Sequence, residues 1–525
     1  MCRRFILYNS SLENHTNWED IWKGGQAMLL RWMKQKMKYQ QEHVTVKEVI
    51  KKLKASDDFV RFEQQARKHT FVISYFTSLV DHDRIMRDLL PYLIQIEEED
   101  LTEIVNKIPI DIKELVKEGQ VVEEALLRGQ LLLEIAHDEH QYALFEVAMN
   151  SEREVSQPEV EFSVTGPQES FIEALDTNLN LVRKRLPIGE LKAKKLIVGK
   201  LTQTKVIVLY IEGIVDQDNL QTLVQRIEAI EFDQVIDSGS IAQMISDDSL
   251  SFFPQFINTE RPERVSAVLA EGKVAFLTDG SPEAVYGPTT LVEFFSSLED
   301  YYLGWQVASF TRLLRFFAVA FSILASPIYV AVLTYHYELI PRDLLGPIIG
   351  SRINIPFPPI IEAVFLELTI ELLREAGARL PTKVGQTIGI VGGIVIGQAS
   401  VEAGLTSNIL LIIVALAALA SFTTPVYQMG NTIRVLRFPF IIMAAWLGLF
   451  GIGITVLYML VHLLHLQSLG RPYLAPIYPP RVTDWKDAFI RLPFSWMNSR
   501  PVYLRPQKRK RLNFRKANKK HDIDE

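Results

Sequence analysis

The sequence predicts an α/β N-terminal part made of two small subdomains, followed by an α-helical multi-pass membrane domain. The strongest observation is an uneven distribution of charge along the 525 residues. The segment Phe316–Gly470 holds 14 Asp, Glu, Lys and Arg in 155 residues, about 9%, whereas the rest of the chain holds about 28%. Soluble proteins do not segregate charge in this way, so one part of the chain is polar and the other suits a bilayer.

Within the predicted membrane domain, residues 312–470, four apolar segments are long enough to cross a bilayer, which takes about 20 residues. We expect these spans at about 313–335, 384–401, 409–429 and 439–461. Buried helices of a soluble core rarely supply four such runs in so short a stretch. The segments are therefore interpreted as transmembrane helices.

A short acidic helix is predicted at 360–377, between the first and second spans, because prolines precede it and a glycine ends it. Glu367, Glu371 and Arg374 recur at helical spacing and share one face, so Glu371 and Arg374 can pair. Two interpretations stay open: an amphipathic helix on the membrane surface, or a re-entrant helix whose carboxylates face water in a pore. Acidic groups at membrane depth often mark ion paths. The pore-lining candidates are Glu362, Glu367, Glu371, Gln386 and Gln398.

The second span carries a stripe of glycines four residues apart, which allows helix backbones to approach closely. Close packing within one subunit and an oligomer contact or pore lining are both open. The predicted helix-packing residues are Gly385, Gly389, Gly393 and Gly397.

The charges next to the spans give conflicting signals about orientation. Ten Lys and Arg between Arg500 and Lys520, with no acid, favour a cytoplasmic C-terminus, and Arg312 and Arg315 favour a cytoplasmic N-terminal part. Four full crossings satisfy both, but they place Arg434 and Arg437 outside. If helix 360–377 also crosses, the basic tail is exported instead. We give the tail more weight because it is larger.

The remaining chain divides by composition and pattern. Residues 1–64 are an N-terminal extension whose segment Ala27–Lys38 either lies on an anionic membrane face or is solvated. Alternating and helical patterns predict subdomain 1 at 65–150 and subdomain 2 at 187–300, joined by a hinge and helix at 151–186. Residues 471–525 form a basic C-terminal tail, for which anionic lipid is the expected partner.

The sequence carries no motif for catalysis or for a cofactor. Its one cysteine, Cys2, excludes an internal disulfide framework and multi-cysteine metal sites, and no phosphate-binding loop, nucleophile elbow or zinc-protease motif is present. The run His137–His140 (HDEH) is interpreted as a hairpin turn rather than a metal site. We therefore expect no enzyme activity, no cofactor, no metal and no nucleic-acid partner.

Five stretches together resemble the GerA family of spore germination proteins, specifically the A subunits of nutrient germinant receptors. They include PFPPIIEAVFLELTIELLREAGARLP and VGQTIGIVGGIVIGQASVEAG, and they lie at Glu161–Leu186, Phe252–Pro282, Pro356–Pro381, Val384–Gly404 and Gly470–Pro480. The resemblance runs from about Phe71 to Arg500 and does not include the first 60 residues or the basic tail.

The resemblance implies a multi-pass protein of the spore inner membrane with a cytoplasmic N-terminal part. It implies a transporter-like B subunit and a lipoprotein C subunit as partners, and homo-oligomers that form a nutrient-gated ion channel. The alternatives are a non-conducting scaffold that assembles the receptor, or the SpoVA-associated paralogue that amplifies germination. The resemblance transfers no binding residues, so the candidates above depend on physical arguments alone.

Overall fold

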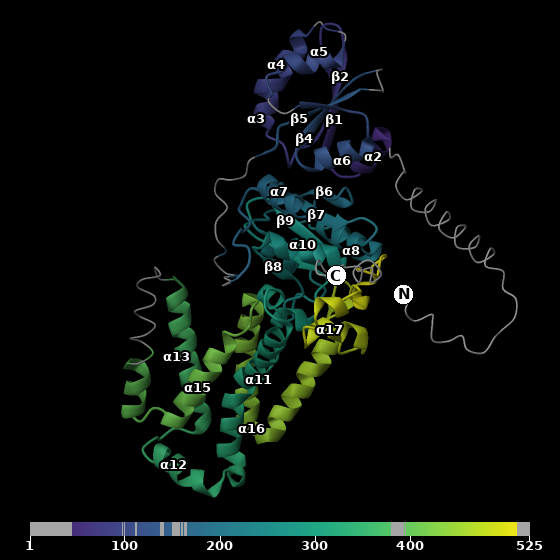
Figure 1. Cartoon of the computed structure of the whole chain (residues 1–525). Helices are drawn as coiled ribbons and strands as arrows, with labels where there is room; N and C mark the ends of the chain where they lie inside the picture. The colour runs from purple at the N-terminus through teal and green to yellow at the C-terminus, as the bar shows by residue number, and fades with distance from the viewer. Residues whose placement is uncertain are drawn as a thin grey trace, which may run out of the picture.

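Three bodies follow one another along the molecule in the computed structural model: subdomain 1, subdomain 2 and a helical domain (Figure 1). The structure describes residues 45–511 apart from 97, 99, 111–112, 137–140, 150–157, 159–160, 162–164, 380–392 and 394. The C-terminal segment, residues 466–511, lies beside subdomain 2 rather than beyond the helices.

Subdomain 1 is a five-stranded antiparallel sheet of order β1-β2-β4-β5-β3, with helices packed against it. One hydrophobic cluster lies under α4 and α5 and another under α2 and α6. Its elements are α2 (Val46–Leu53), β1 (Phe59–Gln65), β2 (Thr70–Phe76), α3 (His82–Arg84), the short π-helix η2 (Ile85–Leu89), α4 (Leu90–Gln95), α5 (Leu101–Lys107), β3 (Lys113–Val116), α6 (Gly119–Leu127), β4 (Gln130–Ile135) and β5 (Tyr142–Glu146).

Subdomain 2 repeats this topology. Its sheet has the order β6-β7-β9-β10-β8, which is the order of subdomain 1 with every strand advanced by five. A helix precedes the first strand of each sheet, and another connects the third strand to the fourth. The elements are α7 (Leu175–Arg185), β6 (Leu191–Val198), β7 (Thr204–Ile211), α8 (Gln217–Glu228), α9 (Ser238–Met244), β8 (Ile257–Thr259), α10 (Pro262–Glu271), β9 (Val274–Thr278), β10 (Ala284–Gly287), and the 3-10 turns η3 (Leu291–Phe295) and η4 (Leu298–Tyr301).

The predicted α/β modules are present, with shifted boundaries. The hairpin expected on either side of residues 137–140 is the antiparallel pair β4 and β5, although the HDEH run itself lies outside the described residues. Subdomain 1 begins near residue 46 rather than 65, because α2 is amphipathic and buries Val46, Val49, Ile50 and Leu53 in its core. Helix α7 belongs to subdomain 2 rather than to a hinge, since Leu175, Leu179 and Val182 are part of that core.

A buried ion pair joins the two subdomains. Arg183 of α7 donates from Nε and Nη2 to both carboxylate oxygens of Asp58, at 2.7 and 2.6 Å, and both side chains are fully buried. The hydroxyls of Ser56 and Ser78 also donate to Asp58, at 2.6 and 2.7 Å. The guanidinium lies 4.3 Å from the centre of the Phe76 ring. This network fixes the orientation of one subdomain on the other, because a buried charge is costly without its partners.

The helical domain contains α11 (Trp305–Tyr335), η5 (Tyr337–Leu339), α12 (Arg342–Arg352), α13 (Pro359–Arg379), a helical stretch at 395–402, α15 (Asn408–Ser421) and α16 (Tyr427–His465). Among the described residues, α11 and α16 are long and apolar enough to cross a membrane, and α15 is a shorter apolar helix. Helix α15 ends eight residues before the expected end of the third span, because Thr423-Thr424-Pro425 interrupts the helix. Most of the second expected span lies outside the described residues.

Helix α16 is two antiparallel limbs that meet at Gly448, whose positive φ of 61° interrupts the helix. Thr432 donates to the carbonyl of Phe252, and His462 lies 2.8 Å from the hydroxyl of Ser251. In a straight helix those two residues would be roughly 45 Å apart. Gly448 lies at the far end of α11, since a Cβ built on it would contact His336. The chain therefore runs away from subdomain 2 and back again within α16. The fourth expected span, 439–461, is thus wrong as one crossing, because the turn at Gly448 lies in its middle.

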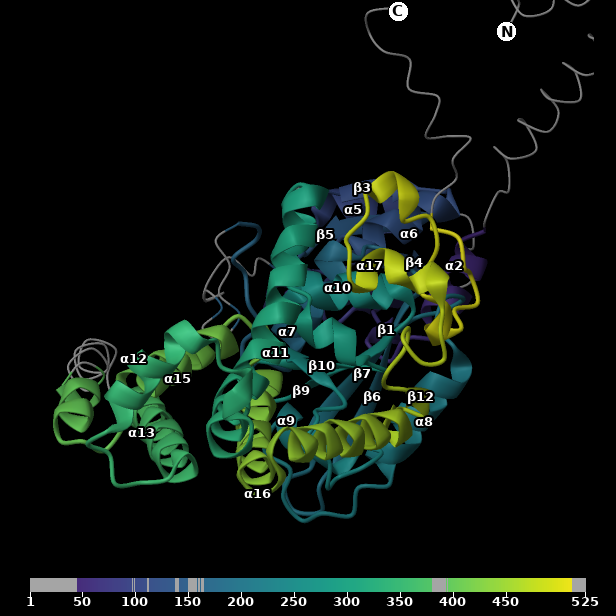
Figure 2. The same ribbon diagram turned by 90° about the horizontal axis from the view of Figure 1, so that it is seen from below.

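The C-terminal segment returns to subdomain 2 and packs on it. Its elements are β11 (Gln467–Ser468), β12 (Arg471–Pro472), η6 (Val482–Asp484), α17 (Trp485–Ala488), η7 (Phe494–Trp496) and η8 (Val502–Leu504). Arg471 pairs with Asp216 at 2.6 Å, and the buried Tyr473 donates to the carbonyl of Pro254 at 2.8 Å. Seen from below, α12, α13 and α15 lie on one side of α11 and the C-terminal segment lies on the other (Figure 2).

Because the chain enters and leaves the helical domain at subdomain 2, it traverses the length of that domain an even number of times. The sequence alone did not decide between an even and an odd number of traverses, since the charges flanking the spans gave conflicting signals about orientation.

We expect Arg183→Met to destabilise the protein by about 3 kcal/mol, because it leaves the carboxylate of Asp58 buried and unpaired. Burial alone raises the pKa of Asp58, but Arg183 and the two serine hydroxyls outweigh it and hold the pKa below its ordinary value. The pair therefore stabilises the fold above the unfolded pKa, and this contribution is lost as pH falls through the lower folded pKa. The difference in unfolding free energy between wild type and Arg183→Met should therefore become smaller below about pH 4.

Thermal unfolding of the full chain in detergent, followed across pH, measures this effect. Lys194→Met is the control, because it removes an exposed pair with Glu228 that should contribute little. Equal losses in the two variants would show that the Asp58–Arg183 pair does not hold the subdomains together.

Candidate functional site

The centre of the helical domain contains a buried ion pair between Glu367 of α13 and Arg437 of α16. Arg437 Nη1 donates to Glu367 Oε2, and each side chain is only 2% exposed. Ser326 of α11 donates to Glu367 Oε1 at 2.7 Å, and Arg437 Nη2 donates to Ser322 Oγ at 2.8 Å. Arg437 also reaches the carbonyl of Ala417 in α15, at 3.5 Å. Four helices thus meet at one charged pair, surrounded by Val, Ile, Leu and Ala side chains.

A second ion pair lies at the end of the helical domain remote from subdomain 2. Glu362, fully buried, pairs with Arg352 of α12 at 2.8 Å. Its other oxygen accepts the backbone N–H of Ser407 at 3.3 Å, and Ser407 is the N-cap of α15. A carboxylate suits this position because free N–H groups and the helix dipole favour negative charge there. Tyr329 of α11 completes the contact with a hydrogen bond of 3.0 Å to Ser407.

A third group, nearest to subdomain 2, contains more cations than carboxylates. Glu371 pairs with Arg374 at 2.6 Å, and the Nε of Arg434 lies 3.8 Å from its other oxygen. Arg374 and Arg434 both donate to the side-chain oxygen of Asn431. The Glu371 side chain is 23% exposed, which makes it the most exposed of the three glutamates.

Where α11 leaves subdomain 2, a further set of charges joins the helices to the α/β part. Asp300 of η4 accepts from Arg312 at 3.0 Å and from Arg315 at 2.6 Å, both from the first turns of α11. Burial raises the pKa of Asp300, but these two arginines outweigh it and hold the pKa below its ordinary value. Arg312 also contacts Asp487 of the C-terminal segment at 3.0 Å, and Tyr301 donates to the same carboxylate at 2.7 Å. Movement of α11 would therefore disturb both subdomain 2 and the C-terminal segment.

Comparison with known proteins identifies the family. The family model described as Bacillus/Clostridium GerA spore germination protein matches residues 47–503. The chain belongs to the GerA family. Spore germination protein GerQA of Bacillus cereus is 51% identical over 469 residues, 89% of this chain and 94% of its own length.

Two further GerA relatives align over similar lengths. Spore germination protein GerIA of Bacillus cereus is 47% identical, covering 88% of this chain and 70% of its own. Spore germination protein KA of Bacillus subtilis (strain 168) is 36% identical, covering 87% and 85%. The crystal structure of the N-terminal domain of the A subunit of the Bacillus megaterium spore germinant receptor GerK3 aligns at 24% identity with a TM-score of 0.36, over 46% of this chain and 91% of that one.

The three predicted glutamates of this GerA chain lie on α13, and the expected pair of Glu371 with Arg374 is present. Gln398 is exposed and donates to Glu402 at 2.8 Å, one turn along the same helix. A Cβ built on Gly397 would make ordinary contact with Leu411 of α15, and one built on Gly393 would meet no atom of the described residues within 4 Å. The other candidates, Gln386, Gly385 and Gly389, lie outside the described residues.

Sequence reasoning missed the arginines that complete the site. It assigned Arg374 to the glutamates but used Arg434 and Arg437 only to judge orientation, and Arg352 not at all. A usable signal was present: an arginine within an apolar helix needs a carboxylate at the same depth. The site's three glutamates and four arginines all lie in the low-charge region, where a buried charge is stable only when it is paired.

We expect Glu367→Gln to lower the amount of protein in the membrane fraction, because it leaves Arg437 buried without a counter-charge, at a cost of about 3–5 kcal/mol. The double variant Glu367→Gln/Arg437→Gln should recover most of that amount, since two neutral amides can still hydrogen-bond to Ser322 and Ser326. Immunoblotting of membranes with a detergent melting curve measures both.

Glu375→Gln is the matched control on the same helix, because Glu375 and its partner Arg379 are largely exposed. If the double variant accumulates as poorly as the single one, the buried pair is not what Glu367 supplies.

Proposed function

We propose that this chain is a multi-pass membrane subunit of a spore germinant receptor, located in the spore inner membrane and acting without enzymatic chemistry. In this proposal it associates with a transporter-like B subunit and a lipoprotein C subunit. Copies of the chain oligomerise into a nutrient-gated ion channel whose opening releases ions and starts germination. Membership of the GerA family and the germination names of its relatives support the receptor part of the proposal.

The proposed topology in the membrane is supported mainly by the return of the chain to subdomain 2 after the helical domain. An even number of traverses puts the α/β part and the C-terminal segment on one side. Arg312 and Arg315 at the start of α11 and the basic residues from Arg500 onward then agree on a cytoplasmic side. The limbs of α16, 427–447 and 449–465, have 21 and 17 residues, or roughly 25–32 Å, which suits a bilayer core. The basic tail beyond Arg511 is proposed to contact anionic lipid headgroups.

The ion path is proposed to run beside the acidic face of α13. Glu362 and Glu367 are fully buried and paired, whereas Glu371 is partly exposed and lies at the end of the helical domain next to subdomain 2. In this proposal Glu371, repeated in each subunit of a ring, supplies the negative charge that favours cations over anions, acting against the neighbouring Arg374 and Arg434. Gln398 is proposed to face the same path, and Gly393 to pack against a second copy, since a Cβ built on it meets no atom of the described residues within 4 Å.

The second candidate function is a non-conducting scaffold that assembles the receptor. The observation in its favour is that each of the three glutamates already has an arginine partner, so the charges hold helices together without any need to meet ions. A role like that of the SpoVA-associated paralogue, which amplifies germination, is compatible with either candidate.

We expect three single cysteines, introduced after Cys2→Ser, to report the side of the membrane. Gln217→Cys in subdomain 2 and Lys508→Cys in the C-terminal segment should react with a membrane-impermeant maleimide from the cytoplasmic side only. Glu338→Cys, in the exposed turn after α11, should react from the opposite side only. Labelling of right-side-out and inside-out vesicles measures this. Reaction of Gln217→Cys and Lys508→Cys from different sides would contradict the proposed topology.

We expect spores that lack this protein and its paralogues to release potassium more slowly after nutrient addition. In that background, Glu371→Gln should restore less potassium flux per copy of protein than wild type, because the change removes charge while keeping size and hydrogen bonding. Potassium release and immunoblotting on the same spores give flux per copy.

Glu375→Gln is again the control, since it removes an exposed charge one turn away. Unchanged release in the deletion strain in every nutrient would refute a role in ion release. Release restored fully by Glu371→Gln would favour the scaffold over the proposed path.

A further inference from the structure

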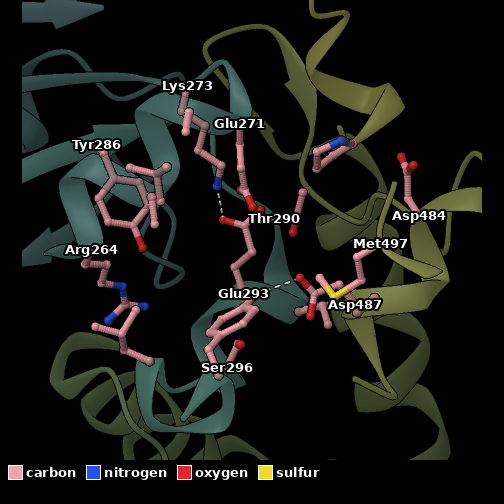
Figure 3. A pocket seen from close by; sticks show the side chains of 18 of the residues that line it. Arg264, Glu271, Lys273, Tyr286, Thr290, Glu293, Ser296, Asp484, Asp487 and Met497 are labelled. Atoms are coloured by element: carbon pink, nitrogen blue, oxygen red, sulfur yellow. Dashed lines mark hydrogen bonds and ion pairs between the residues drawn. The ribbon is translucent and has the colours of Figure 1, made fainter. Parts of the chain in front are cut away.

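A cavity of about 500 Å³ lies where subdomain 2, the start of the helical domain and the C-terminal segment meet. One wall comes from α10, β10 and the turns η3 and η4, and the opposite wall comes from residues 476–511. In Figure 3, Arg264 and Tyr286 lie on the first wall, and Asp484, Asp487 and Met497 lie on the second. This volume is in the range of small-molecule sites in proteins. The ion pairs that α13 makes with α12 and α16 are not part of its lining.

Aromatic rings from both walls line the cavity. They are Tyr286, Tyr301, Tyr302, Phe494 and Tyr503. Two of the tyrosine hydroxyls are fixed by hydrogen bonds to carboxylates: Tyr301 donates to Asp487, and Tyr503 donates to Glu293. Burial raises the pKa of Tyr503 well above its ordinary value, and the negative charge of Glu293 adds to this effect. The phenol of Tyr503 therefore stays neutral. Neutral aromatic rings held in this way offer apolar contact and attract cations to their faces.

The charges on the lining are unbalanced. Five carboxyl groups line the cavity, from Glu263, Glu271, Glu293, Asp484 and Asp487, against three cations from Arg264, Lys273 and Arg511. Each of the three cations already contacts a carboxylate: Arg264 contacts Glu161 at 2.7 Å, Arg511 contacts Glu271 at 2.8 Å, and Lys273 contacts Glu293 (Figure 3). The charge of each cationic side chain of the lining is therefore already balanced by a carboxylate.

Asp484 is different from the other carboxylates. Its oxygens accept backbone N–H groups of Val502 and Tyr503, at 2.9 to 3.2 Å, which fixes the carboxylate at the turn η8. Within the described part of the chain no ion pair is formed by Asp484, whereas Glu263 pairs with Arg261 and Asp487 with Arg312. Asp484 is thus a positioned negative charge at the wall of an aromatic cavity.

We propose that this cavity binds a small organic cation, a protonated amine whose aliphatic or aromatic body packs against the tyrosine rings while its ammonium group faces Asp484. A neutral ligand would use the rings alone, and an anion would add to the negative charge of the lining. The cavity is large enough for a molecule of about ten non-hydrogen atoms with water around its charged end.

This site goes beyond the proposed ion-channel function, because it lies in the cytoplasmic part and gives this subunit a ligand of its own. Asp487 and Tyr301 line the cavity and also contact each other, and Asp487 contacts Arg312 of α11. A ligand that holds the two walls together would therefore also hold the first turns of α11 against the C-terminal segment. Binding can shift the position of the helices only if the ligand binds more tightly when the two walls are together than when they are apart.

Binding of 2-phenylethylammonium to the full chain in detergent tests the proposal, with 3-phenylpropionate and 2-phenylethanol as the anionic and neutral probes of similar shape. We expect saturable binding of the ammonium probe by calorimetry, with a Kd on the order of 1 mM or tighter, and a raised unfolding temperature. The other two probes should bind at least about tenfold more weakly.

Two variants locate the binding. Asp484→Asn should weaken the ammonium probe about tenfold, because it removes the charge but keeps an oxygen for the N–H groups of Val502 and Tyr503. Ala267→Trp should abolish binding, since this exposed alanine of α10 lines the cavity and a ring there would fill it. Asp218→Asn is the control for charge, because Asp218 is exposed on α8, away from the cavity.

The proposal is wrong if no probe saturates, if 3-phenylpropionate binds as tightly as the ammonium probe, or if Ala267→Trp leaves binding unchanged. None of these results depends on ion flux. A failure here therefore leaves the channel proposal standing, and a failure of the channel proposal leaves this site standing.

Discussion

The helical domain depends on one buried contact, the ion pair between Glu367 and Arg437. Aliphatic helices in an apolar environment have little to fix their register, because Leu packs as well against lipid as against another helix. A charge pair changes this, since each charge is costly without its partner at the same depth. By adding hydroxyls from Ser322 and Ser326 and a carbonyl from α15, the pair specifies how α11, α13, α15 and α16 align. Glu362 and Glu371 repeat the principle at the two ends.

The same constraint continues into the α/β part, where Asp300 and Asp487 receive the arginines of the first turns of α11. The C-terminal segment closes this junction by packing on subdomain 2 after the second limb of α16. Subdomain 1 is linked to subdomain 2 by another buried pair, Asp58 with Arg183. Buried charged pairs thus occur at each junction from the first sheet to the centre of the helices. Of these, the contacts of Asp300 and Asp487 with α11 would have to break or adjust if α11 moved relative to subdomain 2.

Much of this architecture could be predicted from the sequence. The low charge of Phe316–Gly470 identified the helical domain, and alternating patterns identified hairpins such as β4 with β5, because both signals are local. The repeated sheet order could not be predicted, since two copies of one topology need not share a sequence pattern. Nor could the fold-back at Gly448, where a single glycine in an apolar run turns a continuous pattern into two antiparallel limbs.

In the candidate site, too, contacts between residues close in sequence could be predicted and contacts between distant residues could not. Residue spacing placed Glu367 and Glu371 on one face of a helix and paired Glu371 with Arg374, three residues away. It could not pair Glu367 with Arg437, which is 70 residues later, because that contact depends on how α13 meets α16. An acidic helix therefore suggested solvated carboxylates, whereas two of the three glutamates are buried ion-pair partners. The cavity beside Asp484 had no sequence signal, since its two walls are about 200 residues apart.

Glu367 and Arg437 thus act as a mutual pair that sets the alignment of the helices. Exchanging the two charges tests it most directly, with Glu367→Arg and Arg437→Glu made singly and together, and with protein amount and potassium release per copy measured in the same spores. Serine hydroxyls can donate or accept, so Ser322 and Ser326 can serve the exchanged pair. We expect each single variant to be lost from the membrane, and the exchanged double variant to accumulate and to restore the proposed potassium release. A double variant that remains as depleted as the singles would contradict it.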